Sequence, residues 1–261
     1  MSLCGVAFHS WSHFLVNYLP KLEFYSEILK GKLVTIFVPE IKDKNISEII
    51  NYYIKNKFSK NTSLVYLKRD QYISCNTLHY IENFSKISDH SLHCYNFSIK
   101  IPNIVRNILP RIFDEISNNY SLNKHNHEKI YIRRGSNKRC LENSKVIETY
   151  FEGEGYQVID CKNLSIEEKI NIFCNVKYIV CDASSALSNI LFCKQNKLKI
   201  LGFSNYSRCF DSFFCNLLDR NNIDLELIFI PGNELEKANI NSNYYIKPEK
   251  IYKAAKLHGF V

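Results

Sequence analysis

"KYIVCDASSALSNILFCKQNKLKILGF", residues 177–203, is the stretch that decides the fold of this chain. It begins with a short apolar run, 178–181, which passes directly into a small polar turn, 182–185. An apolar-faced segment with helical spacing follows, and a second apolar run, 198–201, ends at Gly202. Two apolar runs joined by a helix are typical of the crossover unit of a parallel β-sheet. We therefore predict strand, helix and strand in this order, with the polar turn where the first strand meets the helix.

The same alternation extends from residue 129 to the end of the chain. Apolar runs separated by helical segments of about ten residues indicate a Rossmann-like domain with a parallel sheet of about five strands. Ser165 and Glu168 form the signature of a capping box, and Pro231-Gly232 is expected to break the chain. The predicted strands are 129–134, 156–160, 177–181, 198–203 and 225–230, and the predicted helices are 143–152, from Ser165 onward, from Ser184 onward, 207–218 and 248–257.

The first half of the chain is less regular. Apolar residues from Phe14 to Tyr25 recur with a helical period, and Pro20 is expected to kink or divide that helix. Strands are predicted at 33–39 and 63–68, helices at 43–57 and 102–117, and a linker at 118–128. We predict an α/β fold of two Rossmann-like domains that face a cleft, with the N-terminal domain at 1–118 and the C-terminal domain at 119–261.

The charge of the chain is spread evenly along it. Of its 261 residues, 14 basic and 10 acidic ones lie up to residue 118 and 20 and 16 after it, so each half carries +4. An even distribution argues against a basic nucleic-acid-binding arm, and no nucleic-acid partner is expected. The net charge of +8 suits a phosphate-bearing small ligand or attraction to an anionic membrane surface.

Cysteine usage indicates the compartment. The ten cysteines include no C-x-x-C pair, and zinc-ligand spacing is absent. His90, His93 and Cys94 lie close together, but we interpret them as an ordinary loop rather than a metal site. A disulfide framework is not expected in a core-rich chain of this length, and the N-terminus lacks the basic region of a signal peptide. We therefore expect a cytoplasmic protein, attached at most to the inner face of a membrane.

Candidate ligand groups follow the predicted strands, because open parallel sheets bind ligands at the carboxyl ends of their strands. Arg133 and Arg134 follow the first strand of the second half, and Lys138 and Arg139 come shortly after them. The run "RRGSNKR" holds four cations and no acid. It is either a solvated loop or a diphosphate clamp, since guanidinium groups match phosphate geometry.

A second group follows the strand that ends at Cys181. Ser184 and Ser185 stand at a predicted helix N-terminus, where free N–H groups favour an anion; the alternative is that one serine simply caps the helix. Asp182 either accepts hydrogen bonds from sugar hydroxyls or pairs with one of the arginines. Asn189, inside the helix, is assigned a helix-to-loop hydrogen bond or a ligand contact.

His13 is the candidate general base, because the pKa of histidine lies near neutrality, although a lone histidine on a helix is more often structural. The chain has no glycine-rich phosphate loop and no D-x-D pair, so no metal and no cofactor are indicated.

Taken in order, these segments resemble glycosyltransferase family 61, the capsular-polysaccharide-biosynthesis type. The resemblance covers the first helix and about 60 residues of the second half, with strand, helix and turn motifs in the family's order. One departure is plain, since Ala183-Ser184-Ser185 stand where the family has His-Gly-Ala. The matching segments are "HFLVNYLPKL" (13–22), "YIRRGSNKRCLEN" (131–143), "SIEEKINIF" (165–173) and "CDASSALSNILF" (181–192).

The resemblance implies an inverting glycosyltransferase of the two-domain GT-B architecture, with a nucleotide-sugar donor and a surface-polysaccharide or glycolipid acceptor. Bacterial relatives of this type are associated with capsule or lipopolysaccharide assembly. Carried over by position, Arg133, Lys138 and Arg139 would meet the donor diphosphate, Ser184, Ser185 and Asn189 would line the same pocket, and His13 would face the acceptor. Two alternatives stay open: a non-catalytic relative that binds a nucleotide or glycan as a partner subunit, and a pyruvyl-type transferase on a similar scaffold.

Overall fold

The computed structural model describes residues 1–5, 7–82, 84, 86–87, 99–100, 102–120, 127–134, 138–205, 224–234 and 242–261. The chain divides into two compact units. Unit 1 comprises Met1–Lys86 and Pro102–Ile112, and unit 2 comprises Ile87–Ile101 and Phe113–Val261. The assignment of 1–118 and 119–261 to two domains stays a prediction.

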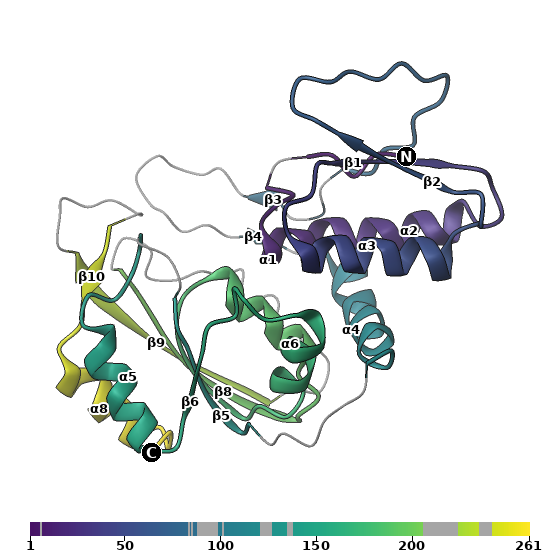
Figure 1. Ribbon diagram of the computed structural model, residues 1–261. Helices are drawn as coiled ribbons and strands as arrows, with labels where there is room; N and C mark the ends of the chain where they lie inside the picture. The colour runs from purple at the N-terminus through teal and green to yellow at the C-terminus, as the bar shows by residue number, and fades with distance from the viewer. Residues whose placement is uncertain are drawn as a thin grey trace. The chain divides into compact units, whose positions relative to one another are not determined.

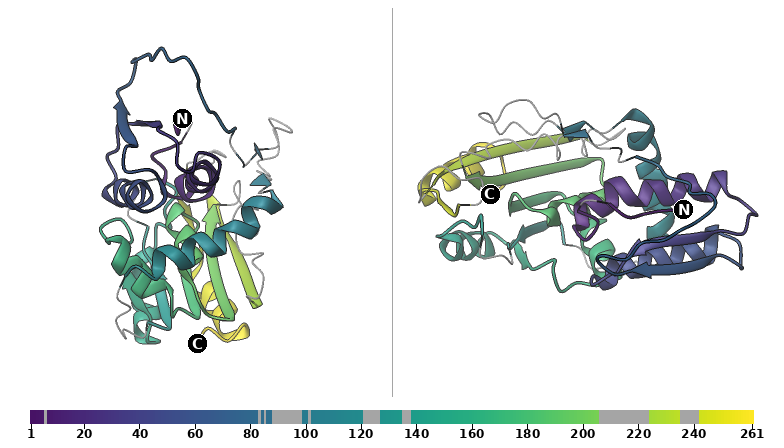
Figure 2. Two further views of the ribbon diagram at one scale, coloured as in Figure 1. Left: turned by 90° about the vertical axis from the view of Figure 1, so that its right-hand side faces the viewer. Right: turned by 90° about the horizontal axis from the view of Figure 1, so that it is seen from above.

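Unit 2 is built on a six-stranded sheet with the order β10-β9-β8-β7-β5-β6 (Figures 1 and 2). All neighbours from β6 to β9 are parallel, and β10 alone pairs antiparallel, with β9. The predicted five parallel strands are thus confirmed, and the sheet has a sixth strand that the sequence did not indicate. The strands are β5 Lys129–Ile132, β6 Gln157–Ile159, β7 Tyr178–Asp182, β8 Lys197–Asn205, β9 Asp224–Glu234 and β10 Tyr244–Tyr245.

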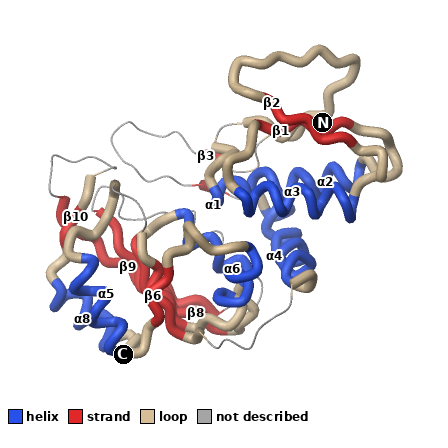
Figure 3. The backbone as a smooth tube through the Cα atoms, in the orientation of Figure 1, coloured by secondary structure: helices blue, strands red, loops and turns tan. Residues whose placement is uncertain are grey.

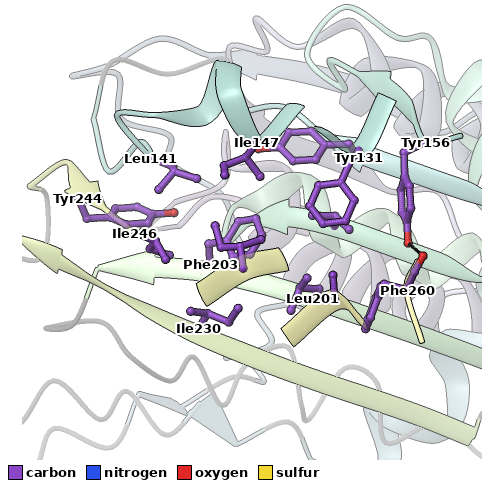
Figure 4. Packing of buried hydrophobic residues seen from close by; sticks show 14 residues of the cluster. Tyr131, Leu141, Ile147, Tyr156, Leu201, Phe203, Ile230, Tyr244, Ile246 and Phe260 are labelled. Carbon is purple, nitrogen blue, oxygen red and sulfur yellow. Dashed lines mark hydrogen bonds between the residues drawn. The ribbon is translucent and has the colours of Figure 1, made fainter. Parts of the chain in front are cut away.

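Helices cover both faces of this sheet. α5 (Ser144–Gly153) and α8 (Pro248–Leu257) lie side by side on one face, where the rings of Tyr150 and Tyr252 stack with centroids 3.9 Å apart. α6 (Ile166–Phe173) lies on the opposite face (Figure 1). The core under α5 and α8 is drawn in Figure 4, and its buried members include Tyr131, Ile147, Phe151, Val180, Leu201, Phe203, Tyr244, Ile251 and Ala255.

The local sequence signals of unit 2 are largely confirmed. Ser165 accepts a hydrogen bond from the Glu168 backbone, and the Glu168 carboxylate accepts one from Ser165, which completes the predicted capping box. The predicted helix after Ser184 is instead a 3-10 helix, η2 (Ser185–Phe192). Its Ser188 and Asn189 are weak α-helix formers, because their side chains compete for nearby backbone groups. The predicted helix 207–218 and the loop with His90, His93 and Cys94 lie outside the described residues.

The prediction that Pro231-Gly232 breaks the chain is wrong. β9 continues through both residues to Glu234, and β8 pairs with it through Asn205↔Gly232. Gly232 has a packing role instead, since a Cβ at this position would overlap the ring of Tyr244 and lie 2.9 Å from the Ile246 side chain. The absence of a side chain at Gly232 therefore lets the β10 segment pack directly on β9.

Gly232→Ala should destabilise the protein by about 1–3 kcal/mol, because the added methyl displaces the Tyr244 ring from a filled site. The free energy of unfolding in urea measures this loss. Gly153→Ala is the matched control: nothing lies within 4 Å of its Cβ position, and it ends α5. That variant should be neutral or slightly stabilising. Equal effects of the two substitutions would contradict the packing role of Gly232.

Unit 1 has a small parallel sheet of β1 (Thr35–Pro39) and β2 (Ser63–Leu67), as the sequence predicts (Figure 3). α3 (Lys44–Lys57) connects the two strands and is capped by Asp43. α4 (Asn103–Ser117), the helix predicted at 102–117, belongs to unit 1 up to Ile112 and to unit 2 from Phe113. Two-residue strands β3 (Lys86–Ile87) and β4 (Ile99–Lys100) form a separate pair, and β4 belongs to unit 2. The expected arrangement of two Rossmann-like domains around a cleft stays a prediction.

The first helix of unit 1 is divided as predicted. It consists of α1 (Trp11–His13), a π-helical segment η1 (Phe14–Tyr18) and α2 (Leu19–Ile28). Pro20 is the second residue of α2 and follows the π-helical segment almost directly. The wider π-helical turn directly before it accommodates the proline ring, which would clash with a carbonyl in an uninterrupted α-helix. No helix in the described part of the chain is long and apolar enough to span a membrane.

Candidate functional site

The candidate site of unit 2 lies at the carboxyl ends of β5 and β7. β5 pairs with β6 on one side and with β7 on the other, so the chain leaves β5 and β6 in opposite directions across the sheet. This is the topological switch point of a doubly wound sheet, where open α/β proteins bind their ligands. Ile132 pairs with Cys181, which places Arg133 and Asp182 at the same level of neighbouring strands.

Arg133 follows β5, and a carboxylate of unit 2 holds its guanidinium. Nε and Nη2 donate to the two carboxylate oxygens of Glu148, on α5, at 2.7–3.2 Å. The side chain of Glu148 is only 4% exposed. The hydrogen bond to Glu148 raises the pKa of Arg133 above its ordinary value. Lys145 is the second cation near Glu148, at 3.9 Å. Arg133 thus pairs with Glu148 through two nitrogens, and its contact with a donor diphosphate stays a prediction.

Arg134 joins the two turns at the switch point. Its Nη1 donates to the carbonyl of Ala183, at 2.6 Å, in the turn after β7. Its Nε donates to the carbonyl of Lys138, at 3.0 Å, at the far end of its own loop. One guanidinium thus fixes the basic loop after β5 to the turn after β7, so the two predicted groups of site residues do come together.

Lys138 and Arg139 complete the described part of the basic loop, and 135–137 lie outside it. The side chain of Lys138 is exposed, while Arg139 is half-buried. Arg139 has a φ of +59°, in the left-handed region that non-glycine residues adopt only under constraint. Its Nε is buried and has no hydrogen-bond partner among the described residues. Lys138 and Arg139 are the other two cations of this loop, and their contact with a diphosphate stays a prediction.

Asp182 ends β7 and is 2% exposed. Tyr244, on β10, donates a short hydrogen bond to its carboxylate. Burial raises the pKa of Asp182 from 3.8 to about 6, although the Tyr244 hydrogen bond and the charge of Arg134 oppose the shift. Burial and the negative charge of Asp182 raise the pKa of Tyr244. Asp182 is therefore a buried carboxylate hydrogen-bonded to Tyr244, and the two roles that the sequence left open for it stay predictions.

The serines and Asn189 lie on η2. Ser184 occupies the N-cap position with extended backbone, but its side chain makes no capping hydrogen bond, so the simple capping interpretation is wrong. Ser185 is exposed. Asn189 is fully buried and donates to the Ala186 carbonyl at 2.8 Å. It also hydrogen-bonds the Cys161 thiol, whose pKa burial raises to about 12, and this is the helix-to-loop bond that the sequence suggested.

His13 belongs to unit 1, at the end of α1, and is half-buried. Its Nδ1 lies 3.5 Å from the Asn17 amide nitrogen, one helical turn later. Its role as a base stays a prediction. Among the described residues, no group of three His, Cys, Asp or Glu side chains could hold a metal ion.

Sequence reasoning missed two residues of the site, Glu148 and Tyr244. Glu148 could have been noticed, because it is an acid beside Ile147 on the apolar stripe that continues to Phe151. Tyr244 carries no local signal. Its contact with Asp182 joins residues 62 positions apart and depends on how β10 packs.

The fold and the candidate site together define a class of protein. A doubly wound, mostly parallel sheet with cationic and hydroxyl side chains at its switch point is the architecture of proteins that bind small anionic ligands. The model of the family described as Glycosyltransferase 61 matches residues 11–200. The chain therefore belongs to glycosyltransferase family 61, as its motifs indicate. A comparison with curated proteins finds no match.

Proposed function

We propose that this chain transfers a sugar, with inversion, from a nucleotide-sugar donor to a polysaccharide or glycolipid acceptor of the bacterial cell surface. Membership of the family supports glycosyl transfer in general. The donor assignment rests on one observation. The Arg134 guanidinium fixes the basic loop to the turn after β7 at the switch point. This junction concentrates cations and hydroxyls where the ligand of such a sheet binds.

The site residues take different roles in this proposal. Lys138 and Arg139 meet the donor diphosphate, and Ser184 and Ser185 offer hydroxyl groups at the start of η2. Arg133 and Arg134 act through the protein, because their guanidinium groups already bind Glu148 and the Ala183 carbonyl. The charge of the loop stabilises the diphosphate as the glycosidic bond to it breaks.

His13 is the proposed base. It accepts the proton of the acceptor hydroxyl as that oxygen attacks the anomeric carbon from the side opposite the diphosphate. The bond to the diphosphate breaks, and its electrons leave with the nucleoside diphosphate. Attack from the opposite side inverts the configuration of the sugar. No metal or other cofactor takes part in this proposal.

A glycolipid acceptor would place the protein at the cytoplasmic face of a membrane. The net charge of +8 supports a peripheral attachment to anionic lipids, with attraction that added salt would weaken.

A non-catalytic relative that binds a nucleotide or glycan is the second candidate. The observation that favours it is the sequence Ala183-Ser184-Ser185, which lacks the imidazole and the glycine expected in the family at this turn. Such a protein would bind a nucleotide sugar and release no nucleoside diphosphate, so binding and turnover assays together separate the two candidates.

Lys138→Ala should weaken the binding of the matching nucleoside diphosphate about tenfold, because an exposed ammonium group is lost from the proposed diphosphate site. A thermal-shift titration with UDP, GDP and CMP and their sugars identifies the ligand of the wild-type protein. Lys253→Ala, which removes an exposed lysine from α8, is the matched control and should bind as the wild type does. Stabilisation by none of these ligands would contradict the proposed donor.

A further inference from the structure

The basic loop is held at its C-terminal end by a segment far along the chain. Residues 140–143 follow Arg139 directly, and residues 243–246 include β10 and lie beyond the segment 11–200 that the family model matches. Leu141 and Tyr244 form a parallel bridge between the two segments. The backbone N–H of Tyr244 donates to Cys140 at 3.0 Å, and that of Glu142 donates to Tyr244 at 2.9 Å.

Asn243 adds a side-chain clamp to this backbone pairing. Its Oδ1 accepts from the Cys140 N–H at 3.0 Å, and its Nδ2 donates to the Glu142 carboxylate at 2.7 Å. A side chain of the 140–143 segment also bonds to the 243–246 segment: Nδ2 of Asn143 donates to the Ile246 carbonyl at 2.9 Å. Residues 243–246 are therefore joined to 140–143 at both ends of the short pairing.

Tyr244 extends the contact into the core beneath the loop. Its hydroxyl donates to the buried Asp182, whose neighbour Ala183 accepts from Arg134. In Figure 4 the phenol groups of Tyr131 and Tyr244 point toward the same region of the core, between Leu141 and Phe203. The segment thus contacts both structures that Arg134 joins, the basic loop and the turn after β7.

The constraint is visible in the backbone of Arg139. Its left-handed φ of +59° is unfavourable for a residue with a side chain, by about 1–2 kcal/mol. The next residue, Cys140, is bonded through its N–H to Asn243 and through its carbonyl to Tyr244. These bonds oppose the relaxation of Arg139 and so hold the side chain in the orientation that the loop presents.

We propose that Asn243 and Tyr244 are positioning residues, which hold Lys138 and Arg139 in the arrangement that binds a diphosphate. The identity of the ligand in this inference rests on the proposed function. That residues 243–246 hold the loop rests only on the contacts described above. It predicts that loosening the segment lowers diphosphate affinity although neither residue touches the ligand.

Asn243→Ala is the main test, because it removes the acceptor of the Cys140 N–H and leaves the backbone pairing in place. Hydrogen exchange of the Cys140 amide should become about tenfold faster, as expected for the loss of one hydrogen bond of about 1.4 kcal/mol. The affinities for inorganic pyrophosphate, UDP and GDP should fall by a similar factor. Asn196→Ala, an exposed asparagine at the amino end of β8, is the control and should leave exchange and affinity unchanged.

Tyr244→Phe separates the buried contact from the backbone pairing, since it removes only the hydroxyl that reaches Asp182. Exchange at Cys140 should stay within about twofold of the wild-type rate, while pyrophosphate affinity falls. Tyr245→Phe makes the same chemical change at the exposed neighbour and should have no effect.

Each outcome decides a different point. Unchanged exchange at Cys140 in Asn243→Ala would overturn the holding contact, and faster exchange with unchanged affinity would overturn its role in binding. A wild-type protein that binds none of the three probes would contradict the proposed donor site itself. The exchange measurement would then still decide whether residues 243–246 hold the loop.

Discussion

Wild-type protein should lose about 3 kcal/mol of stability relative to the Asp182→Asn variant as the pH rises from about 3 to about 7. The reason is the burial of the Asp182 carboxylate, which raises its pKa from 3.8 to about 6 in the folded protein. Below about pH 3 the carboxyl group is protonated in both the folded and the unfolded chain, so its titration has no effect on stability. Between about pH 4 and pH 6 the unfolded chain releases this proton first, and the folded state becomes progressively less favourable.

Urea unfolding of both proteins at several pH values measures this difference, and the other titrating groups cancel because the two proteins share them. Tyr244→Phe provides an independent check. The Tyr244 hydrogen bond lowers the pKa of Asp182, so its removal should move the loss of stability to higher pH. A difference between wild type and Asp182→Asn that does not change over this range would show that Asp182 does not titrate with a raised pKa.

Arg133→Met should destabilise the protein by roughly 2–3 kcal/mol, because it leaves the buried Glu148 carboxylate without its main partner. Glu148 is 4% exposed, and after the substitution only Lys145 remains near it, at 3.9 Å. The loss is smaller than for a fully buried pair because the Arg133 side chain is 45% exposed. The double variant Arg133→Met/Glu148→Gln should recover most of the stability, because it removes the unpaired charge.

The ion pair between Lys177 and Glu128 is a matched control for this experiment. Its nitrogen–oxygen distance is also 2.7 Å, but both side chains are about half exposed, at 45% and 51%. Lys177→Met should therefore cost less than about 1 kcal/mol in urea unfolding. If Arg133→Met and Lys177→Met lost the same stability, the burial of Glu148 would not be the cause of the loss in Arg133→Met.

Because of the Glu148 contact, an Arg133 variant is a poor test of ligand binding. A substitution that unsettles Glu148 and α5 would lower nucleotide affinity through the fold, whether or not Arg133 touches the ligand. Lys138→Ala is the cleaner test of the diphosphate assignment, since the Lys138 side chain is exposed and is not part of the Glu148 contact.

The elements of unit 2 were predictable because their signals are local. Buried parallel strands such as β7 read as continuous apolar runs, and α6 begins at a complete capping box within a few residues of sequence. Pro231-Gly232 shows the limit of this reasoning. The pair carries a strong local turn signal, but the packing of Tyr244 and Ile246 against Gly232 keeps it within β9.

The sequence predicted the location of the site better than the contacts within it. The rule that ligands bind at the carboxyl ends of parallel strands correctly brought Arg134 and the turn after β7 together. It could not show that Glu148 would bind Arg133, because the apolar stripe of α5 indicates which face packs on the sheet but not which side chain at its edge reaches the loop. The same holds for Ser184, which has the position of a cap and lacks the hydrogen bond.

By itself the sequence determined the family, the α/β class, the order of strands and helices in unit 2, and the basic loop and polar turn at adjacent strand ends. These properties depend on side-chain periodicity and on residues close in the chain. Only the tertiary structure decided the sixth strand, the pairing of Arg133 with Glu148, and the contacts of Asn243 and Tyr244 with the loop and with Asp182. Those contacts join residues up to 103 positions apart, and they form only when the core brings distant segments within hydrogen-bond distance.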